Sequence, residues 1–158
     1  MLSKKRKSRA GFTLVELLAV IVIIGILTSG ILLSGGAATS SARALNIVND
    51  LRGMKEAVLM MYIDKMDNFD SGNTDFSKLK PHEALKDYVD NPEKYDDAHY
   101  GFAVDNGKWY VTYTIQNSDP GAADIKKALT GRAKSAGLFK DISRDPYNGG
   151  EIVYMAVR

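Results

Sequence analysis

The chain has 158 residues, 45% hydrophobic and 25% charged, which is the composition of one ordinary globular domain and not of a disordered or fibrous chain. It has no cysteine, which excludes a disulfide framework, a thiol enzyme and a thiolate metal site. The net charge of +2 includes five basic residues in the first eleven positions; the rest has 16 basic against 19 acidic residues, so overall charge is no argument for nucleic-acid binding.

An apolar segment, residues 12–33, follows the basic cluster and carries one charge, at Glu16. As a helix it would be roughly 33 Å long, against roughly 30 Å for the hydrocarbon core of a bilayer. The basic residues before it predict a cytoplasmic N-terminus and a translocated remainder. An ordinary signal peptide, a plain membrane anchor and a buried core helix are the alternatives. The segment is too long for an ordinary signal peptide. It is also too large for so small a domain to bury as a core helix.

Glu16 separates these alternatives. A carboxylate in an apolar region costs several kcal/mol, by order of magnitude, unless it is paired. The next basic residue along the chain is Arg43, and a plain anchor gains nothing from such a charge. The pattern therefore indicates a partner outside the segment itself.

The motif at the start of the apolar segment is Gly11-Phe12-Thr13-Leu14-Val15-Glu16, after a basic leader and before an apolar stretch that reaches Leu27. It resembles the processing motif of type IV prepilins and of the pseudopilins of type II secretion. The resemblance implies that a prepilin peptidase cuts between Gly11 and Phe12, and that the new Phe12 amine is N-methylated. It further implies an inner-membrane assembly platform and a homo-oligomeric helical filament.

The resemblance also implies that Glu16 pairs with the Phe12 amine of a neighbouring subunit. Four helical residues span about 6 Å, so sliding one helix past another by that distance brings the two groups level. Each then offsets the other's charge in a low dielectric. The alternative role of Glu16 is recognition by the peptidase or methylase. Gly25 matches a glycine common in the family and begins a small-xxx-small pattern with Ser29, which permits close helix approach.

The chain departs from the family near Leu33, where many pilins have a proline. Gly35-Gly36 follow instead, and paired glycines also weaken a helix. We divide the chain into a cleaved basic leader (1–11), the transmembrane and filament-core half of the N-terminal helix (12–36), and a globular pilin-like head (37–158).

In the head, one apolar stripe with 4-3-4-3 spacing predicts that the helix resumes after Gly36 and packs on a sheet. Its members are Ile47, Leu51, Met54, Val58 and Met61. The pattern fades at the turn residues 67–73, and residues 67–99 indicate a polar, acid-rich connection with a short helix around residues 81–88. His82 and His99 lack metal-ligand spacing and are expected to be solvated loop residues.

A hairpin is the clearest fold signal. Residues 100–104 and 109–115 alternate as strands around Asn106-Gly107, which favours a two-residue type I′ turn. That register places an aromatic strip on one face, expected to be the core face of the sheet. The expected pairs are Val104 with Trp109, Phe102 with Val111, Tyr100 with Tyr113, and Asp105 with Lys108.

Asp119-Pro120 predicts a helix start, with Asp119 as the cap, and Gly137 predicts its end. Residues 124–144 have six basic against two acidic side chains. Three interpretations stay open for this basic surface: a solvated face, a contact with an acidic neighbouring subunit, or DNA capture.

The last segment contains turns over residues 145–150 and an alternating strand from Glu151. Some pseudopilins bind calcium in a loop near this place, and Asp141, Asp145 and Asn148 are the weak calcium candidates here. The leading expectation is an ordinary turn, with no metal and no other cofactor.

The predicted fold class is α+β: a pilin-like long N-terminal helix packed on a small antiparallel sheet, with an additional helix. We find no phosphate loop, nucleophile elbow or zinc motif, and infer no enzyme. The leading hypothesis is a structural subunit of a type IV pilus (fimbrium) or a type II secretion pseudopilus, in the cytoplasmic membrane before assembly and an extracytoplasmic or cell-surface filament afterwards, with no nucleic-acid partner. The alternatives are a membrane-tethered extracytoplasmic binding protein and a DNA-capturing minor pilin.

Overall fold

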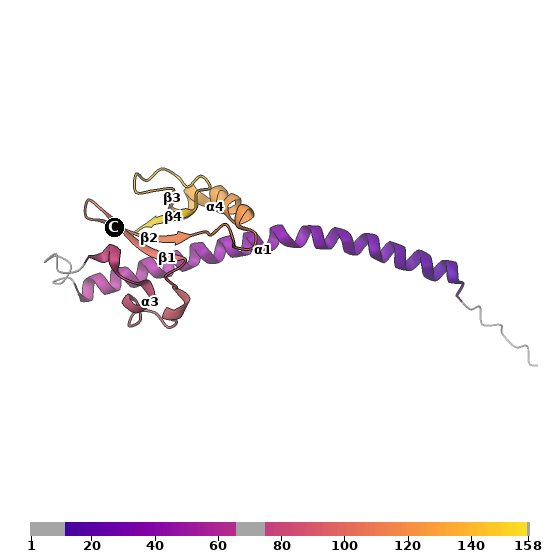
Figure 1. Ribbon diagram of the computed structural model, residues 1–158, viewed down its shortest axis with the longest axis horizontal. Helices are drawn as coiled ribbons and strands as arrows, with labels where there is room; N and C mark the ends of the chain where they lie inside the picture. Colours follow the sequence, from indigo (N-terminus) through magenta and orange to yellow (C-terminus); the bar gives the residue numbers. More distant parts are fainter. Residues whose placement is uncertain (1–11, 66–74, 158) are drawn as a thin grey trace, which may run out of the picture. The chain divides into compact units, whose positions relative to one another are not determined.

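The computed structural model describes residues 12–65 and 75–157, with the side chains of residues 29–37 outside the description. Gly11, the rest of the basic leader and the predicted turn at 67–73 lie outside the described residues. The chain divides into two compact units, residues 1–36 and 37–158, and each is described by itself. Figure 1 shows the elements along the chain.

Helix α1 runs from Leu14 to Asp64 and includes Gly35 and Gly36 within its length. In its second half the predicted apolar stripe is buried in the core, with Leu51, Met54 and Val58 fully covered. The 4-3-4-3 spacing therefore identified the inner face of this helix correctly. Ala44, Val48 and Ala57 widen the same face, so the buried surface is broader than the stripe alone.

The hairpin forms with the predicted register. Strand β1 (Tyr100–Asp105) pairs antiparallel with β2 (Lys108–Thr114), and Val104 lies opposite Trp109. Asn106 and Gly107 both have positive φ angles, 47° and 73°, as a type I′ turn requires. The remaining predicted pairs are Phe102 with Val111, Tyr100 with Tyr113 and Asp105 with Lys108.

The sheet has four antiparallel strands in the order β1-β2-β4-β3. Strand β4 (Ile152–Ala156) pairs with β2 on one side and with the two-residue β3 (Leu138–Phe139) on the other. The predicted α+β fold is confirmed. Central strand β2 is buried on both faces: Trp109 belongs to the main core, whereas Tyr110 on the opposite face donates its hydroxyl to the Ile142 carbonyl 3.2 Å away.

Helix α4 (Ala122–Ala136) begins later than the sequence predicts and ends where it predicts. The N-cap is Gly121, and its φ of 77° is left-handed. Asp119 does not cap the helix, because its carboxylate accepts a hydrogen bond from the Gln116 backbone N–H at 2.9 Å instead. Gly137, with a φ of 69°, closes the C-terminus as expected.

In its described part, residues 75–99, the acid-rich connection contains only single turns: the 3-10 helices η1 (Phe76–Lys78) and η2 (Pro92–Lys94), and α3 (Pro81–Ala84). The helix predicted for residues 81–88 thus ends after one turn. The Phe76 ring lies 4.4 Å from Phe102 and 4.3 Å from Trp109, centroid to centroid. The aromatic strip of the hairpin is therefore covered by the chain itself and belongs to the core.

Candidate functional site

The N-terminal unit has an apolar helical segment that its own chain leaves uncovered. Every described side chain from Phe12 to Thr28 is exposed, and the exposed fraction of Leu14 reaches 90%. Twelve of these are large hydrophobic residues: Phe12, Leu14, Val15, Leu17, Leu18, Val20, Ile21, Val22, Ile23, Ile24, Ile26 and Leu27. Soluble monomers rarely expose so large a contiguous apolar surface, which is typical of segments that contact lipid or other proteins.

A search of the described residues for a helix of sufficient length and apolar character to span a membrane finds none.

Glu16 takes part in a capping box at the start of α1. Its Oε2 atom accepts hydrogen bonds from the Thr13 backbone N–H at 2.8 Å and from the Thr13 hydroxyl at 2.9 Å. In return, the Glu16 N–H donates to the Thr13 hydroxyl oxygen at 3.2 Å. The carboxylate also lies at the positive end of the helix dipole. Glu16 therefore has a local partner within the chain.

The capping box satisfies only one of the two carboxylate oxygens. Within the described part of the chain, no hydrogen bond reaches Oε1 of Glu16. A carboxylate can accept several hydrogen bonds, so Glu16 keeps capacity for a further donor while Thr13 holds its orientation. The spacing Thr13-x-x-Glu16 is a capping signature in the sequence itself, and it is compatible with the predicted amine partner because the second carboxylate oxygen stays available.

Gly25 is not required by packing within the chain. A Cβ atom built at this position would meet nothing within 4 Å. Nearby, the Thr28 hydroxyl donates to the Ile24 carbonyl at 2.7 Å, so its polar group is satisfied within the helix. A packing role for Gly25 would therefore concern contacts with other molecules, and its assignment to assembly stays a prediction.

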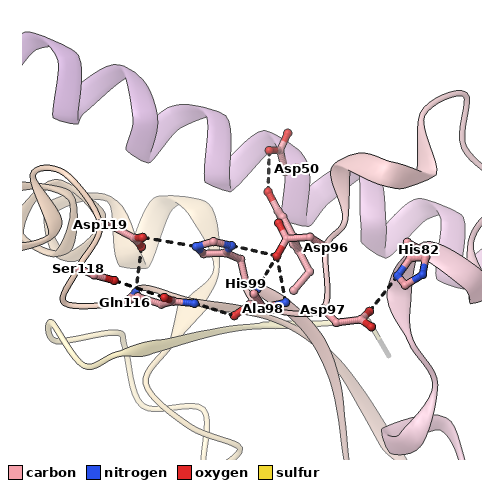
Figure 2. Close-up of polar contacts among 10 residues, drawn as sticks. Asp50, His82, Asp96, Asp97, Ala98, His99, Gln116, Ser118 and Asp119 are labelled. Carbon is pink, nitrogen blue, oxygen red and sulfur yellow. Dashed lines mark hydrogen bonds and ion pairs between the residues drawn. The ribbon is translucent and has the colours of Figure 1, made fainter.

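The head contains a polar network centred on His99 (Figure 2). His99 Nδ1 lies 3.0 Å from Asp96 Oδ1, and His99 Nε2 lies 3.5 Å from Asp119 Oδ1. Its ring also stacks on Tyr113, with centroids 5.6 Å apart. Both histidines are partly exposed, as the sequence predicts, but His82 lies in the short helix α3 and not in a loop, with its Nδ1 2.9 Å from Asp97 Oδ1.

The network shifts the pKa of several groups. Burial would lower the pKa of His99, but the hydrogen bonds to Asp96 and Asp119 outweigh it and raise the pKa above its usual value. Burial and the hydrogen bond to Asp50, 2.8 Å away, raise the pKa of the Tyr100 hydroxyl far above its usual value. The Asp50 carboxylate also raises the pKa of Lys94, its ion-pair partner. These groups tie α1, η2, β1 and the turn before α4 together.

A cavity of about 290 Å³ adjoins this network. Its walls carry the positive charge of Arg43 and the negative charges of Asp50 and Asp119, and His99 also lines them. Arg43 is anchored by a 2.7 Å hydrogen bond to the Pro120 carbonyl. We therefore assign the network a structural role, which joins segments distant in sequence.

Two of the three weak calcium candidates, Asp141 and Asp145, lie beside a lysine. Lys140 Nζ is 2.9 Å from Asp145 Oδ2 and 3.9 Å from Asp141 Oδ2. Asp141 also accepts hydrogen bonds from the N–H and hydroxyl of Ser143, which lower its pKa. An ammonium group thus already occupies the position between the two carboxylates. Among the described residues, no group of three acidic or histidine side chains is placed to hold a metal ion.

Comparison with known families identifies the N-terminal segment. Residues 6–32 match the family model of the prokaryotic N-terminal methylation motif. Neither a curated protein nor a solved structure matches the chain. The motif predicted from the sequence is thereby confirmed, and it contains Phe12, Glu16 and Gly25.

Proposed function

We propose, from the N-terminal methylation motif that is the hallmark of type IV pilins and pseudopilins, that this chain is a structural subunit of a type IV pilus or a type II secretion pseudopilus. It is made as a prepilin, cut after Gly11 and N-methylated at Phe12. Its apolar N-terminal helix then builds it into a helical filament. The leading role is structural and not enzymatic.

The observation that carries this proposal is the apolar helical surface of residues 12–28, which is exposed along its whole length and bears a single acid. Such a surface needs lipid or other copies to cover it. Before assembly we expect the precursor to be held in the cytoplasmic membrane with the head outside. After assembly we expect neighbouring helices to replace lipid around the same side chains.

Glu16 gives the assembly its register in this proposal. Thr13 occupies one carboxylate oxygen, and the Phe12 amine of a neighbouring subunit binds the other. A charge pair in an apolar interior is tolerated when both partners are present, whereas one partner alone is strongly disfavoured. The pair therefore penalises every axial shift that separates the two groups.

Mass spectrometry of the mature protein tests the processing step. We expect a chain that begins at Phe12 and carries one methyl group on its amine. A Gly11→Leu variant should keep its leader, because the peptidase backbone must approach closely at this position. An unprocessed wild-type chain, or a terminus near residue 43, would reject the proposal.

Substitution of Glu16 tests the assembly step separately. Glu16→Ala should still be cut after Gly11 but should fail to enter filaments, since an unpaired amine costs about 3–5 kcal/mol in each contact. Thr13→Val is the matched control: it keeps the carboxylate and loses only the capping hydroxyl, worth about 0.5–2 kcal/mol. It should reduce filament yield less than Glu16→Ala. Normal assembly of Glu16→Ala would leave a membrane-tethered domain as the better account.

A further inference from the structure

Opposite charges lie at opposite edges of the head sheet. Edge strand β1 contacts η1 and α3, in the acid-rich connection, whereas edge strand β3 contacts α4 in the basic region. Figure 1 shows α3 and α4 on opposite sides of the second half of α1. The head therefore presents an acidic edge and a basic edge that face away from each other.

The acidic edge has a turn whose carboxylates have no partner among the described residues. We define the acidic turn as residues 86–93, which contain Asp87, Asp90 and Glu93 and one cation, Lys86. All three acids are exposed, and no hydrogen bond or ion pair joins their carboxylates to another described residue. Other acids of the connection are engaged, as Asp75 is with Lys78 and Asp97 with His82. Half-buried Val89 lies among the acids and supplies an apolar centre.

The basic edge has a groove of about 380 Å³ between α1, the end of α4 and strands β3 and β4. We define the basic groove by its lining residues Arg52, Lys55, Glu56, Gly137, Phe139 and Met155. Among the described residues, no ion pair or hydrogen bond engages the side chain of Arg52 or of Lys55. By contrast, Arg132 is held by the chain itself, through the Ser41 hydroxyl at 3.0 Å.

We propose that the basic groove of one copy of this chain receives the acidic turn of the next copy. A filament of identical subunits needs a head-to-tail interface, in which two different surfaces of one subunit are complementary. The groove and the turn meet this requirement because they lie at opposite edges of the same sheet. The contact rests on the proposed function, which supplies the assembled copies.

The charges that line the basic groove favour a second copy of the chain, and not a nucleic acid, as its occupant. Arg52 and Lys55 face the turn's carboxylates, and charge-assisted hydrogen bonds of this kind are the stronger ones. Glu56 in the groove would repel a phosphate backbone, but it matches Lys86 of the turn. The half-buried Phe139 side chain offers apolar surface to Val89. The groove therefore suits a mixed-charge protein segment with an apolar centre.

Cysteine cross-linking in assembled filaments tests the contact directly, because the natural chain has no cysteine. A Lys55→Cys/Asp90→Cys double variant treated with a short bifunctional thiol reagent should give a ladder of linked subunits. A Lys55→Cys/Asp124→Cys variant is the matched control. Asp124 is an exposed acid in the first turn of α4, at the basic edge, and should give no ladder.

Charge reversal tests whether attraction between the two surfaces contributes to assembly. Arg52→Glu/Lys55→Glu should lower filament yield by about tenfold, and Asp87→Lys/Asp90→Lys should do the same. The two reversals combined in one chain should restore the yield, and high salt should weaken the wild-type contact. Lys108→Glu, at the exposed hairpin tip, is the control and should have no effect.

The cross-linking and charge-reversal results distinguish failure of the proposed contact from failure of the proposed function. Normal filaments that give no 55–90 ladder and tolerate both reversals would overturn the contact and leave the pilin-like function intact. Retention of duplex DNA that is lost on reversal of Arg52 and Lys55, with assembly unchanged, would likewise overturn it in favour of DNA capture. A mature chain that never forms filaments would overturn both proposals.

Discussion

The two halves of α1 are both rich in apolar residues, but only one is covered by its own chain. In the second half, Leu51, Met54 and Val58 are fully buried against the sheet and the connection. In the first half, the described side chains from Phe12 to Thr28 are all exposed. The second half has apolar residues on one face and polar ones on the other, whereas the first is apolar all round.

The two halves show that the periodicity of the apolar residues, and not their number, distinguishes a helix packed on its own sheet from a helix with an exposed apolar surface. A stripe on one face indicates a single covering surface, which the sheet of the same chain provides. A helix that is apolar on all faces must be covered on every side, which one small domain cannot do. Under the proposed function, lipid and later several neighbouring helices provide that covering.

The largest expected effect comes from truncating one leucine in each half. Leu51→Ala should lower the free energy of unfolding of the head by about 2–5 kcal/mol, because it opens a cavity in the core. Leu18→Ala should change it by less than about 0.5 kcal/mol, since Leu18 is exposed in the single chain. Denaturant titration of the full chain in detergent, followed by fluorescence of the single tryptophan, Trp109, measures both. Equal losses in the two variants would contradict the comparison.

A smaller pair of effects, of opposite sign, is expected within α4. Gly137 has a left-handed φ of 69° at the C-cap, so Gly137→Ala should destabilise the head by about 1–2 kcal/mol. Gly131 lies in the exposed helix interior, where a Cβ atom meets nothing within 4 Å, so Gly131→Ala should stabilise it by up to about 1 kcal/mol. Thermal unfolding compares the two. A shift in the same direction for both would reject the helix end assigned here.

The smallest expected effect is a pH dependence from His99. Because its carboxylate partners raise the pKa of His99 in the folded head, its contribution is fully present below the unfolded pKa of about 6.5 and is lost as pH rises through the folded pKa. Asp96, Asp119 and Tyr113 are the groups that face the ring. The side chain is 28% exposed, so solvent screening keeps the effect small.

Unfolding titrations between pH 5.5 and 8 should show this decline in the wild type and a flatter profile in His99→Gln. The difference between the two profiles isolates His99 from His82, which both proteins share. If the wild-type head instead became more stable relative to His99→Gln as pH rises, the predicted pH dependence of His99 would be wrong.

Features set by neighbouring residues could be predicted from the sequence. The hairpin register follows from Asn106-Gly107 and from strict alternation on both sides, and all the predicted pairs form. The inner face of α1 follows from its spacing. The processing motif was recognised from a short run of residues, and the family comparison confirms it. In each case the signal and the structure it predicts lie within a few residues of each other.

Features set by distant residues were missed or assigned wrongly. Asp119 has the residue type of a helix cap, but the Gln116 N–H and His99 compete for its carboxylate. Strand β3 is too short to show alternation, and it exists because β4 offers it an edge. Burial of Tyr110 depends on the segment near Ile142, 32 residues further on. The basic groove likewise combines three parts of the chain that no local pattern connects.

The strand order has a consequence for how the head is made. Strand β4 comes last along the chain among the described strands, yet it lies inside the sheet between β2 and β3. The hairpin of β1 and β2 can close early from nearby residues, but β3 has no strand to pair with until residues 152–156 emerge. A ribosome that stalls, or a protease that cuts, before Ile152 would leave β2 with an open edge, and such edges recruit strands from other chains. The stage before residues 152–156 emerge is therefore the one at which the head is most open to pairing with strands of other chains.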